Sequence, residues 1–110
     1  VLAQYNLGIL YSAGRGVPRN EAEATNWYRL AAEQGYVLAQ STLGLRFLEG
    51  QGAARDKVEA FLWLGLASAR GDSRATRHRD SLALTMTSQQ LAEAQRRVRD
   101  WKPSAPKPAQ

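Results

Sequence analysis

The spacing of apolar and small residues along the chain predicts paired helices. Two groups of these residues recur every three or four positions, so each group shares one face of a helix. The first group is Ala3, Leu7, Leu10 and Tyr11. The second group is Ala24, Trp27, Tyr28, Ala31 and Ala32. A polar stretch with glycine and proline separates the groups, which predicts a helical hairpin.

The hairpin pattern occurs twice. Aligning residues 3–38 with residues 39–74, at a shift of 36 positions, gives 13 identities, mainly at small, aromatic and aliphatic positions. A repeat of about 20–50 residues is typical of a solenoid, in which each unit packs on its neighbours. Residues 75–101 keep helical spacing but lose the glycines of the repeat, as expected for a terminal cap with a polar outer face.

These patterns predict an all-α fold. We expect an α-solenoid of two helix-turn-helix repeats, at residues 1–38 and 39–74, and a C-terminal capping helical pair at residues 75–101. The expected stack is a short right-handed superhelix. Residues 102–110 are rich in proline and poor in apolar side chains, which predicts a disordered tail. The chain opens without an initiator methionine or a signal-peptide pattern, so we interpret it as a piece of a longer protein.

The glycines of the repeat have structural explanations. Gly8 and Gly44 lie inside predicted helices, where each costs about 1 kcal/mol relative to alanine, so we expect packing too close for a methyl group. The glycines of both Gly-x-Gly elements are expected to end the first helices and form the loops. They lack the lysine and hydroxyl residue of a phosphate-binding loop. These loop glycines are Gly14, Gly16, Gly50 and Gly52.

Capping residues mark the helix starts. Asn20 and Asp56 precede the second helices, each with a glutamate three residues later, which predicts a capping box at both sites. Thr87 and Gln90 predict another for the last helix.

The order of these residues resembles a known family. The string Ala-x-x-x-Leu-Gly-x-x-Tyr-x-x-Gly-x-Gly-Val, followed by Ala-x-x-Trp-Tyr-x-x-Ala-Ala-x-x-Gly, is similar to the Sel-one-like repeat, a relative of the tetratricopeptide repeat. The resemblance covers about residues 1–74. It implies a non-catalytic scaffold or adaptor that binds a protein or peptide, with the first helices lining a concave groove. It also favours a bacterial source and a periplasmic or secreted location.

A second apolar stripe follows the first helices of both repeats. A simple amphipathic helix would be polar there, so we interpret the stripe as part of a groove for an extended segment or helix of a partner. Packing between neighbouring repeats is the alternative, and the exposed end of the first repeat could also self-associate. In the cap, the same row carries positive charge, for which an acidic stretch or the C-terminal carboxylate of a partner is the natural counterpart. A solvated face of the cap is the alternative. The predicted groove residues are Tyr5, Ile9, Ser12, Ser41, Leu45, Leu48, Glu49, Arg74, Arg77 and Ser81.

The net charge of +5 is concentrated at one end. Residues 1–69 carry six basic and six acidic side chains, whereas residues 70–110 carry nine basic and four acidic ones. Electrostatic binding of nucleic acid or another anionic polymer through residues 74–99 is therefore the alternative function, although no exposed aromatic residues accompany the arginines.

Catalytic, metal and cofactor sites are not predicted. His78 is the only histidine, and the sequence supplies no orienting partner near it, so we expect a solvated cap residue and not a general base. The sequence has no cysteine and no grouping of nucleophile, base and orienting residue. We therefore expect no enzyme activity, no small-molecule substrate and no insertion into a membrane, because no long apolar run occurs.

Overall fold

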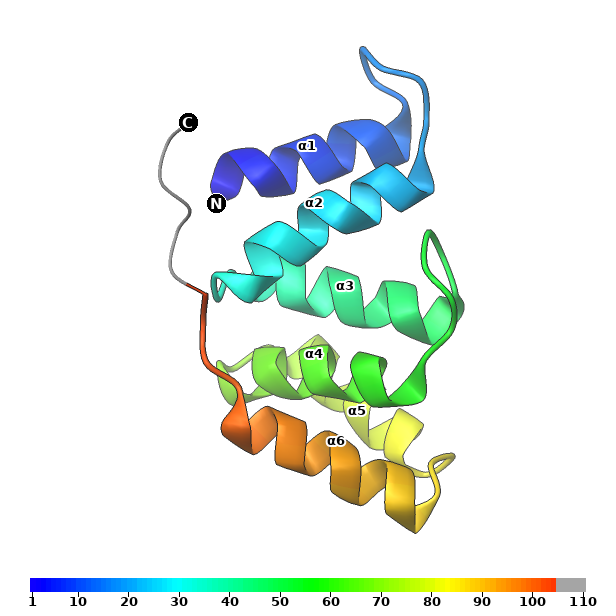
Figure 1. Cartoon of the computed structure of the whole chain (residues 1–110), viewed down its shortest axis with the longest axis vertical. Helices are drawn as coiled ribbons and strands as arrows, with labels where there is room; N and C mark the ends of the chain where they lie inside the picture. Colours follow the sequence, from blue (N-terminus) through cyan, green and yellow to red (C-terminus); the bar gives the residue numbers. More distant parts are fainter. Residues whose placement is uncertain (105–110) are drawn as a thin grey trace.

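Six helices follow one another along the described part of the chain, residues 1–104 of the computed structural model, and no strand occurs among these residues. The first four helices stack in chain order along the longest axis of the molecule, the fifth lies behind the fourth, and the sixth lies at the end of the stack (Figure 1). This arrangement confirms the predicted all-α solenoid. The helices are α1 (Leu2–Ala13), α2 (Glu21–Glu33), α3 (Val37–Glu49), α4 (Lys57–Ala69), α5 (Ser73–Ala83) and α6 (Ser88–Asp100).

Close contact between the two helices of each hairpin explains the glycines inside α1 and α3. A Cβ atom at Gly8 would lie 2.6 Å from Cε1 of Tyr28 in α2. A Cβ atom at Gly44 would lie 2.7 Å from Cγ of Leu64 in α4. The prediction that these helices pack too closely for a methyl group is confirmed.

The predicted caps form, but two of them are only half of a capping box. Asn20 accepts a hydrogen bond from the Glu23 backbone N–H at 3.0 Å, and Asp56 accepts one from the Glu59 N–H at 3.1 Å. The reciprocal bond from the N-cap backbone to the glutamate is found only in the box of α6 within residues 1–104, where glutamine takes its place. The Glu59 carboxylate instead accepts a hydrogen bond from Nε1 of Trp63 at 3.2 Å, so the prediction of a full box at Asp56 is wrong.

The core is centred on α4. Every residue from Ala60 to Ala67 is buried, because α3, α5 and α6 all pack on this helix. A helix that is apolar all round is expected to be surrounded in this way. Within residues 1–104, no helix is both long and apolar enough to span a bilayer.

The cap departs from the packing of the repeats. Helices α5 and α6 each pack on α4 but make few contacts with each other, whereas α1 pairs with α2 and α3 with α4. Gly65 of α4 occupies the repeat position of Arg29 in α2, and a Cβ atom at Gly65 would lie 3.1 Å from Cγ2 of Val98 in α6. The absence of a side chain at Gly65 therefore allows α6 to lie directly on α4.

The chain after α6 runs back toward the first repeat (Figure 1). The Ser104 N–H donates a hydrogen bond to the Glu33 carbonyl oxygen at 2.6 Å, and Pro103 lies near Gly35 in the turn between α2 and α3. The disordered tail predicted for residues 102–110 stays a prediction, and residues 105–110 lie outside the described residues.

Candidate functional site: a pocket on the first helices

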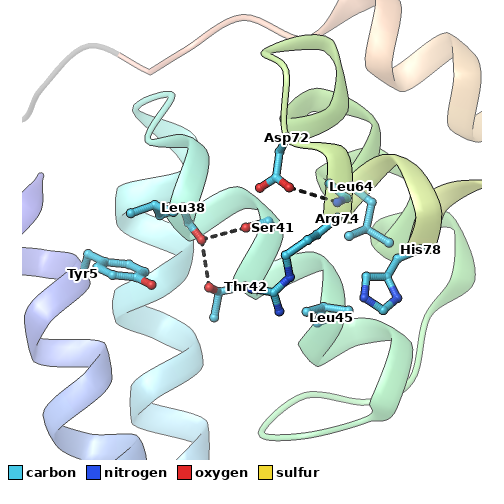
Figure 2. A pocket seen from close by; sticks show the side chains of 10 residues that line it. Tyr5, Leu38, Ser41, Thr42, Leu45, Leu64, Asp72, Arg74 and His78 are labelled. Atoms are coloured by element: carbon cyan, nitrogen blue, oxygen red, sulfur yellow. Dashed lines mark hydrogen bonds between the residues drawn. The ribbon is translucent and has the colours of Figure 1, made fainter.

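A pocket of about 140 Å³ lies where α3 meets α5, on the side formed by the first helices (Figure 2). Helix α1 contributes one residue to its lining, Tyr5, and α4 contributes Leu64. The remaining lining residues are Leu38, Ser41, Thr42 and Leu45 of α3, Asp72 at the start of α5, and Arg74, Ala75 and His78 of α5.

Packing holds the lining in place. The Tyr5 ring is tilted against the Tyr28 ring, with centroids 5.4 Å apart, and meets the Tyr36 ring edge to face at 5.3 Å. Leu38 and Leu45 are two turns apart on α3 and so share one face of that helix. The apolar side of the pocket is therefore formed by residues of the two packed repeats.

The serine and threonine hydroxyl groups in the pocket are already engaged. Ser41 and Thr42 donate hydrogen bonds to the carbonyl oxygen of Leu38, at 3.1 and 2.8 Å. Asp72 accepts the Ala75 backbone N–H at 3.0 Å and so caps α5. In contrast, the side chains of Arg74 and His78 form no hydrogen bond or ion pair with any residue from 1 to 104.

Four of the predicted groove residues line this pocket together: Tyr5, Ser41, Leu45 and Arg74. They come from α1, α3 and α5, so residues of these three helices that were predicted to line one groove meet in the pocket. Tyr5, Leu45 and Leu48 also pack against the core, as the alternative of packing between repeats implied.

The other predicted residues lie outside the pocket lining. Ile9 is exposed on α1, and Glu49 is exposed at the end of α3. Arg77 and Ser81 are exposed on α5. Their part in a groove stays a prediction.

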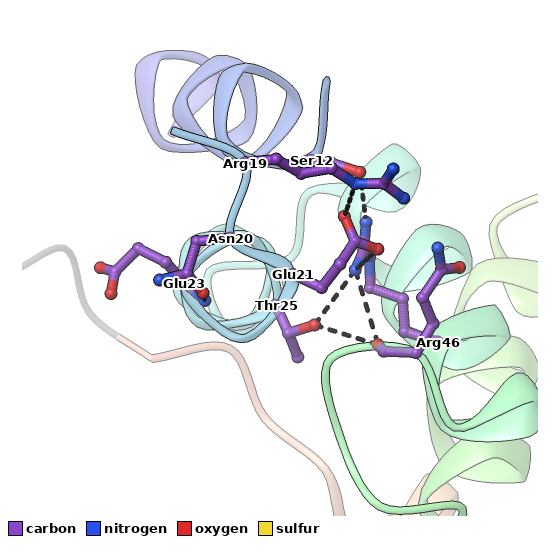
Figure 3. Close-up of polar contacts among 8 residues, drawn as sticks. Ser12, Arg19, Asn20, Glu21, Glu23, Thr25 and Arg46 are labelled. Carbon is purple, nitrogen blue, oxygen red and sulfur yellow. Dashed lines mark hydrogen bonds and ion pairs between the residues drawn. The ribbon is translucent and has the colours of Figure 1, made fainter. Parts of the chain in front are cut away.

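Ser12 belongs to a polar cluster between the two repeats (Figure 3). Its hydroxyl accepts a hydrogen bond from Nη2 of Arg46 at 2.8 Å. Nη1 of Arg46 lies 3.3 Å from Oε2 of Glu21, and its guanidinium is 4.9 Å from the centroid of the Tyr28 ring. Only 7% of the Arg46 side chain and 22% of the Glu21 side chain are exposed.

The cluster shifts the pKa of Glu21 below its ordinary value of 4.5. Partial burial raises this pKa, but the nearby Ser12 hydroxyl and the guanidinium groups of Arg46 and Arg19 together outweigh that effect and lower it. Glu21 is therefore charged at neutral pH and contributes to the joint between repeats.

Sequence reasoning missed Arg46 and the pocket residues Thr42, Asp72 and His78. A signal for Arg46 existed, because leucine occupies the same repeat position 36 residues before and after it, at Leu10 and Leu82. A charged residue at a position where the neighbouring units carry leucine indicates a polar contact for its side chain. His78, which we expected to be a solvated cap residue, is half-buried in the pocket lining.

The arginines of α6 are paired with acidic neighbours. Arg96 and Arg97 both contact the Glu93 carboxylate, and Arg97 also lies 3.1 Å from Glu59. Arg99 lies 3.4 Å from the carboxylate of Asp100. These contacts pair three arginines of the basic end, whereas Arg74 and Arg77 of α5 form no ion pair within residues 1–104. Electrostatic binding of nucleic acid therefore stays a prediction.

The stacked hairpins with close glycine contacts define a helical repeat protein. The Sel1 repeat pattern matches residues 1–36 and 37–72, so the chain belongs to the Sel1 repeat family. Proteins of this family generally mediate protein–protein interactions. A comparison with curated proteins finds no match.

Two solved structures show the same fold. A protective antigen present in uropathogenic Escherichia coli strains, which displays an SLR fold, is 36% identical, with a TM-score of 0.85 over 90% of this chain. A Sel1 repeat protein from Oxalobacter formigenes is 39% identical, with a TM-score of 0.70 over 73% of this chain. This chain covers 21% of the first protein and 60% of the second.

Proposed function

We propose that this chain is a non-catalytic module that binds a segment of a partner protein along the groove formed by α1, α3 and α5. The pocket carries this proposal, because it joins Tyr5, Leu45 and Arg74 from those three helices into one concave surface. Grooves with apolar side chains are a recurring way in which proteins bind a segment of a partner.

Exposed apolar side chains extend the surface around the pocket. Leu38 lines the pocket and is 51% exposed, and Ile9 is exposed on the neighbouring helix α1. A partner that covers them would gain about 25 cal/mol for each Å² of apolar surface removed from water. This gain supports binding of a segment that carries at least one aliphatic or aromatic residue.

The test is selection of random linear peptides displayed on phage, followed by binding measurements with the wild-type chain and two variants. Leu38→Asp places a charge in the pocket at a half-exposed position, so the fold should persist. Leu84→Asp makes the same change at a residue that is 90% exposed and lies outside the pocket. We expect selected peptides to lose binding to Leu38→Asp and to keep binding to Leu84→Asp. Equal binding to both variants would refute the groove.

We also propose that the exposed end of the first repeat can self-associate. Helix α1 contains no charged residue, and Leu2 and Leu10 remain exposed on it. Analytical ultracentrifugation should show a concentration-dependent dimer that Leu10→Asp abolishes. A monomer at every concentration would contradict this proposal.

A further inference from the structure

The pocket presents two hydrogen-bond donors without partners. The Tyr5 hydroxyl and the Arg74 guanidinium form no hydrogen bond with residues 1–104. The nearby Leu38 carbonyl already accepts two hydroxyl groups, and the Asp72 carboxylate caps α5. A group that satisfies the Tyr5 and Arg74 donors must accept hydrogen bonds.

The charged side chains around the pocket indicate which kind of hydrogen-bond acceptor fits it. Figure 2 shows the Arg74 side chain extending from α5 toward Thr42 and Leu45 on α3, so its charge lies within the pocket. Arg77 lies one turn further along α5, exposed and without an acidic partner among the described residues. The acid on α5 itself, Asp80, contacts Arg79 at 3.0 Å. Asp72 is the one acid of the pocket lining, and its carboxylate forms no ion pair with Arg74 or Arg77 among residues 1–104. The two arginines therefore outnumber the single acid on this face, which favours an anionic group.

The size of the pocket limits what can enter it. A cavity of about 150 Å³ accommodates a group the size of benzene. The pocket of about 140 Å³ therefore suits a single side chain, with the rest of the partner segment lying across its rim.

We propose that the pocket receives the carboxylate of an aspartate or glutamate side chain from the partner segment, held by Arg74. A neighbouring aliphatic residue of the same segment packs on Leu38 and Leu45. This inference rests on the proposed groove function and adds the chemistry of its partner. A charge-assisted hydrogen bond to arginine also gives direction, because the planar guanidinium can contact both carboxylate oxygens.

The test uses the peptides selected on the wild-type chain, synthesised with an amidated C-terminus so that the only carboxylates are those of side chains. Each acidic residue is replaced in turn by its amide, aspartate by asparagine and glutamate by glutamine. Binding is measured by calorimetry against the wild type, Arg74→Gln and Arg15→Gln. Arg15 is an exposed arginine of the first loop, so its variant controls for the loss of one positive charge.

We expect one acidic residue in each peptide to depend on Arg74. Its amide form should bind the wild type about fivefold to tenfold more weakly, as for one charge-assisted hydrogen bond at a partly exposed site. Arg74→Gln should weaken the acidic peptide by a similar factor and leave the amide peptide nearly unchanged. Arg15→Gln should bind both forms as the wild type does.

Two outcomes separate this inference from the groove function. Peptides that need Leu38 but bind Arg74→Gln as tightly as the wild type would overturn the carboxylate site and leave the groove intact. Peptides that ignore both Leu38→Asp and Arg74→Gln would overturn both proposals. Equal weakening by Arg15→Gln and Arg74→Gln would show that net charge, and not the pocket, attracts the acidic residue.

Discussion

The ion pair between Arg46 and Glu21 should couple the two repeats measurably. Arg46 is almost fully buried and Glu21 largely so, and they are contributed by α3 of the second repeat and α2 of the first. Removing one partner of a buried pair leaves the other charge uncompensated, which costs about 3–5 kcal/mol when burial is complete. We expect Glu21→Gln to lower the free energy of unfolding by about 3 kcal/mol, because Arg46 would remain buried without a counter-charge.

Replacing Arg46 should cost less. In Arg46→Leu the Glu21 carboxylate is partly exposed and can regain water, and a leucine fits the position that Leu10 and Leu82 occupy in the neighbouring units. We expect a loss of about 2 kcal/mol. If the groups interact directly, the coupling is about 2–3 kcal/mol, so the double variant should be no less stable than Glu21→Gln alone.

Urea unfolding followed by circular dichroism measures these free energies. Arg19→Gln is the control, since Arg19 contacts the same carboxylate at 3.6 Å but is 67% exposed, and its loss should cost about 0–1 kcal/mol. Effects of the two single changes that add to within about 0.5 kcal/mol in the double variant would refute the coupling.

Three further predictions follow from the same structure. Because the pKa of Glu21 is lowered in the folded state, its charge contributes fully to the free energy of unfolding well above pH 4.5, and this contribution is lost as the pH falls through the folded pKa. The stability advantage of the wild type over Glu21→Gln should therefore shrink in acid, which urea unfolding across pH 3–7 would show. Gly44→Ala should lower stability by about 1–2 kcal/mol despite better helix propensity, because the new methyl group meets Leu64; a higher melting temperature in circular dichroism would contradict this. Ser104→Pro removes the N–H that bonds to Glu33 and should cost about 1 kcal/mol in the same urea assay, whereas Ser104→Ala keeps the N–H and should be nearly neutral.

Local signals explain why much of the fold could be predicted from sequence. Helix periodicity, the glycines that end helices and the Asx caps all act within a few residues of the chain, so a single sequence contains them. The close approach at Gly44 was also predictable, because glycine inside a helix is costly unless something packs against it. The repeat then supplied the order in which the hairpins stack.

Contacts between distant segments explain what could not be predicted. The contact of Arg46 with Glu21 joins positions 25 residues apart, and the direction of a long side chain cannot be read from periodicity. The pocket depends on how α5 lies against α3, which places His78 beside residues of the second repeat. The single glycine at position 65 was not enough to predict that α6 packs on α4 and not on α5.

Gly52 and Gly16 offer a direct measure of how closely one repeat fits the next. Both have left-handed backbones, with φ of 71° and 75°, so alanine at either position carries a strain of about 1–2 kcal/mol. Their surroundings differ, because a Cβ atom at Gly52 would lie 2.2 Å from the backbone oxygen of Glu21, whereas nothing lies within 4 Å of one at Gly16.

Gly52→Ala should therefore cost about 1–3 kcal/mol more than Gly16→Ala, since backbone of the preceding repeat must move to admit the methyl group. Urea unfolding of both variants at low protein concentration, where no association covers the first repeat, measures the difference. Equal losses of stability in the two variants would mean that the loop around Gly52 adjusts without strain and that α2 is not in close contact with it. A larger loss at Gly52 would show that this glycine is required by the joint between repeats, whereas Gly16 is required only by its own turn.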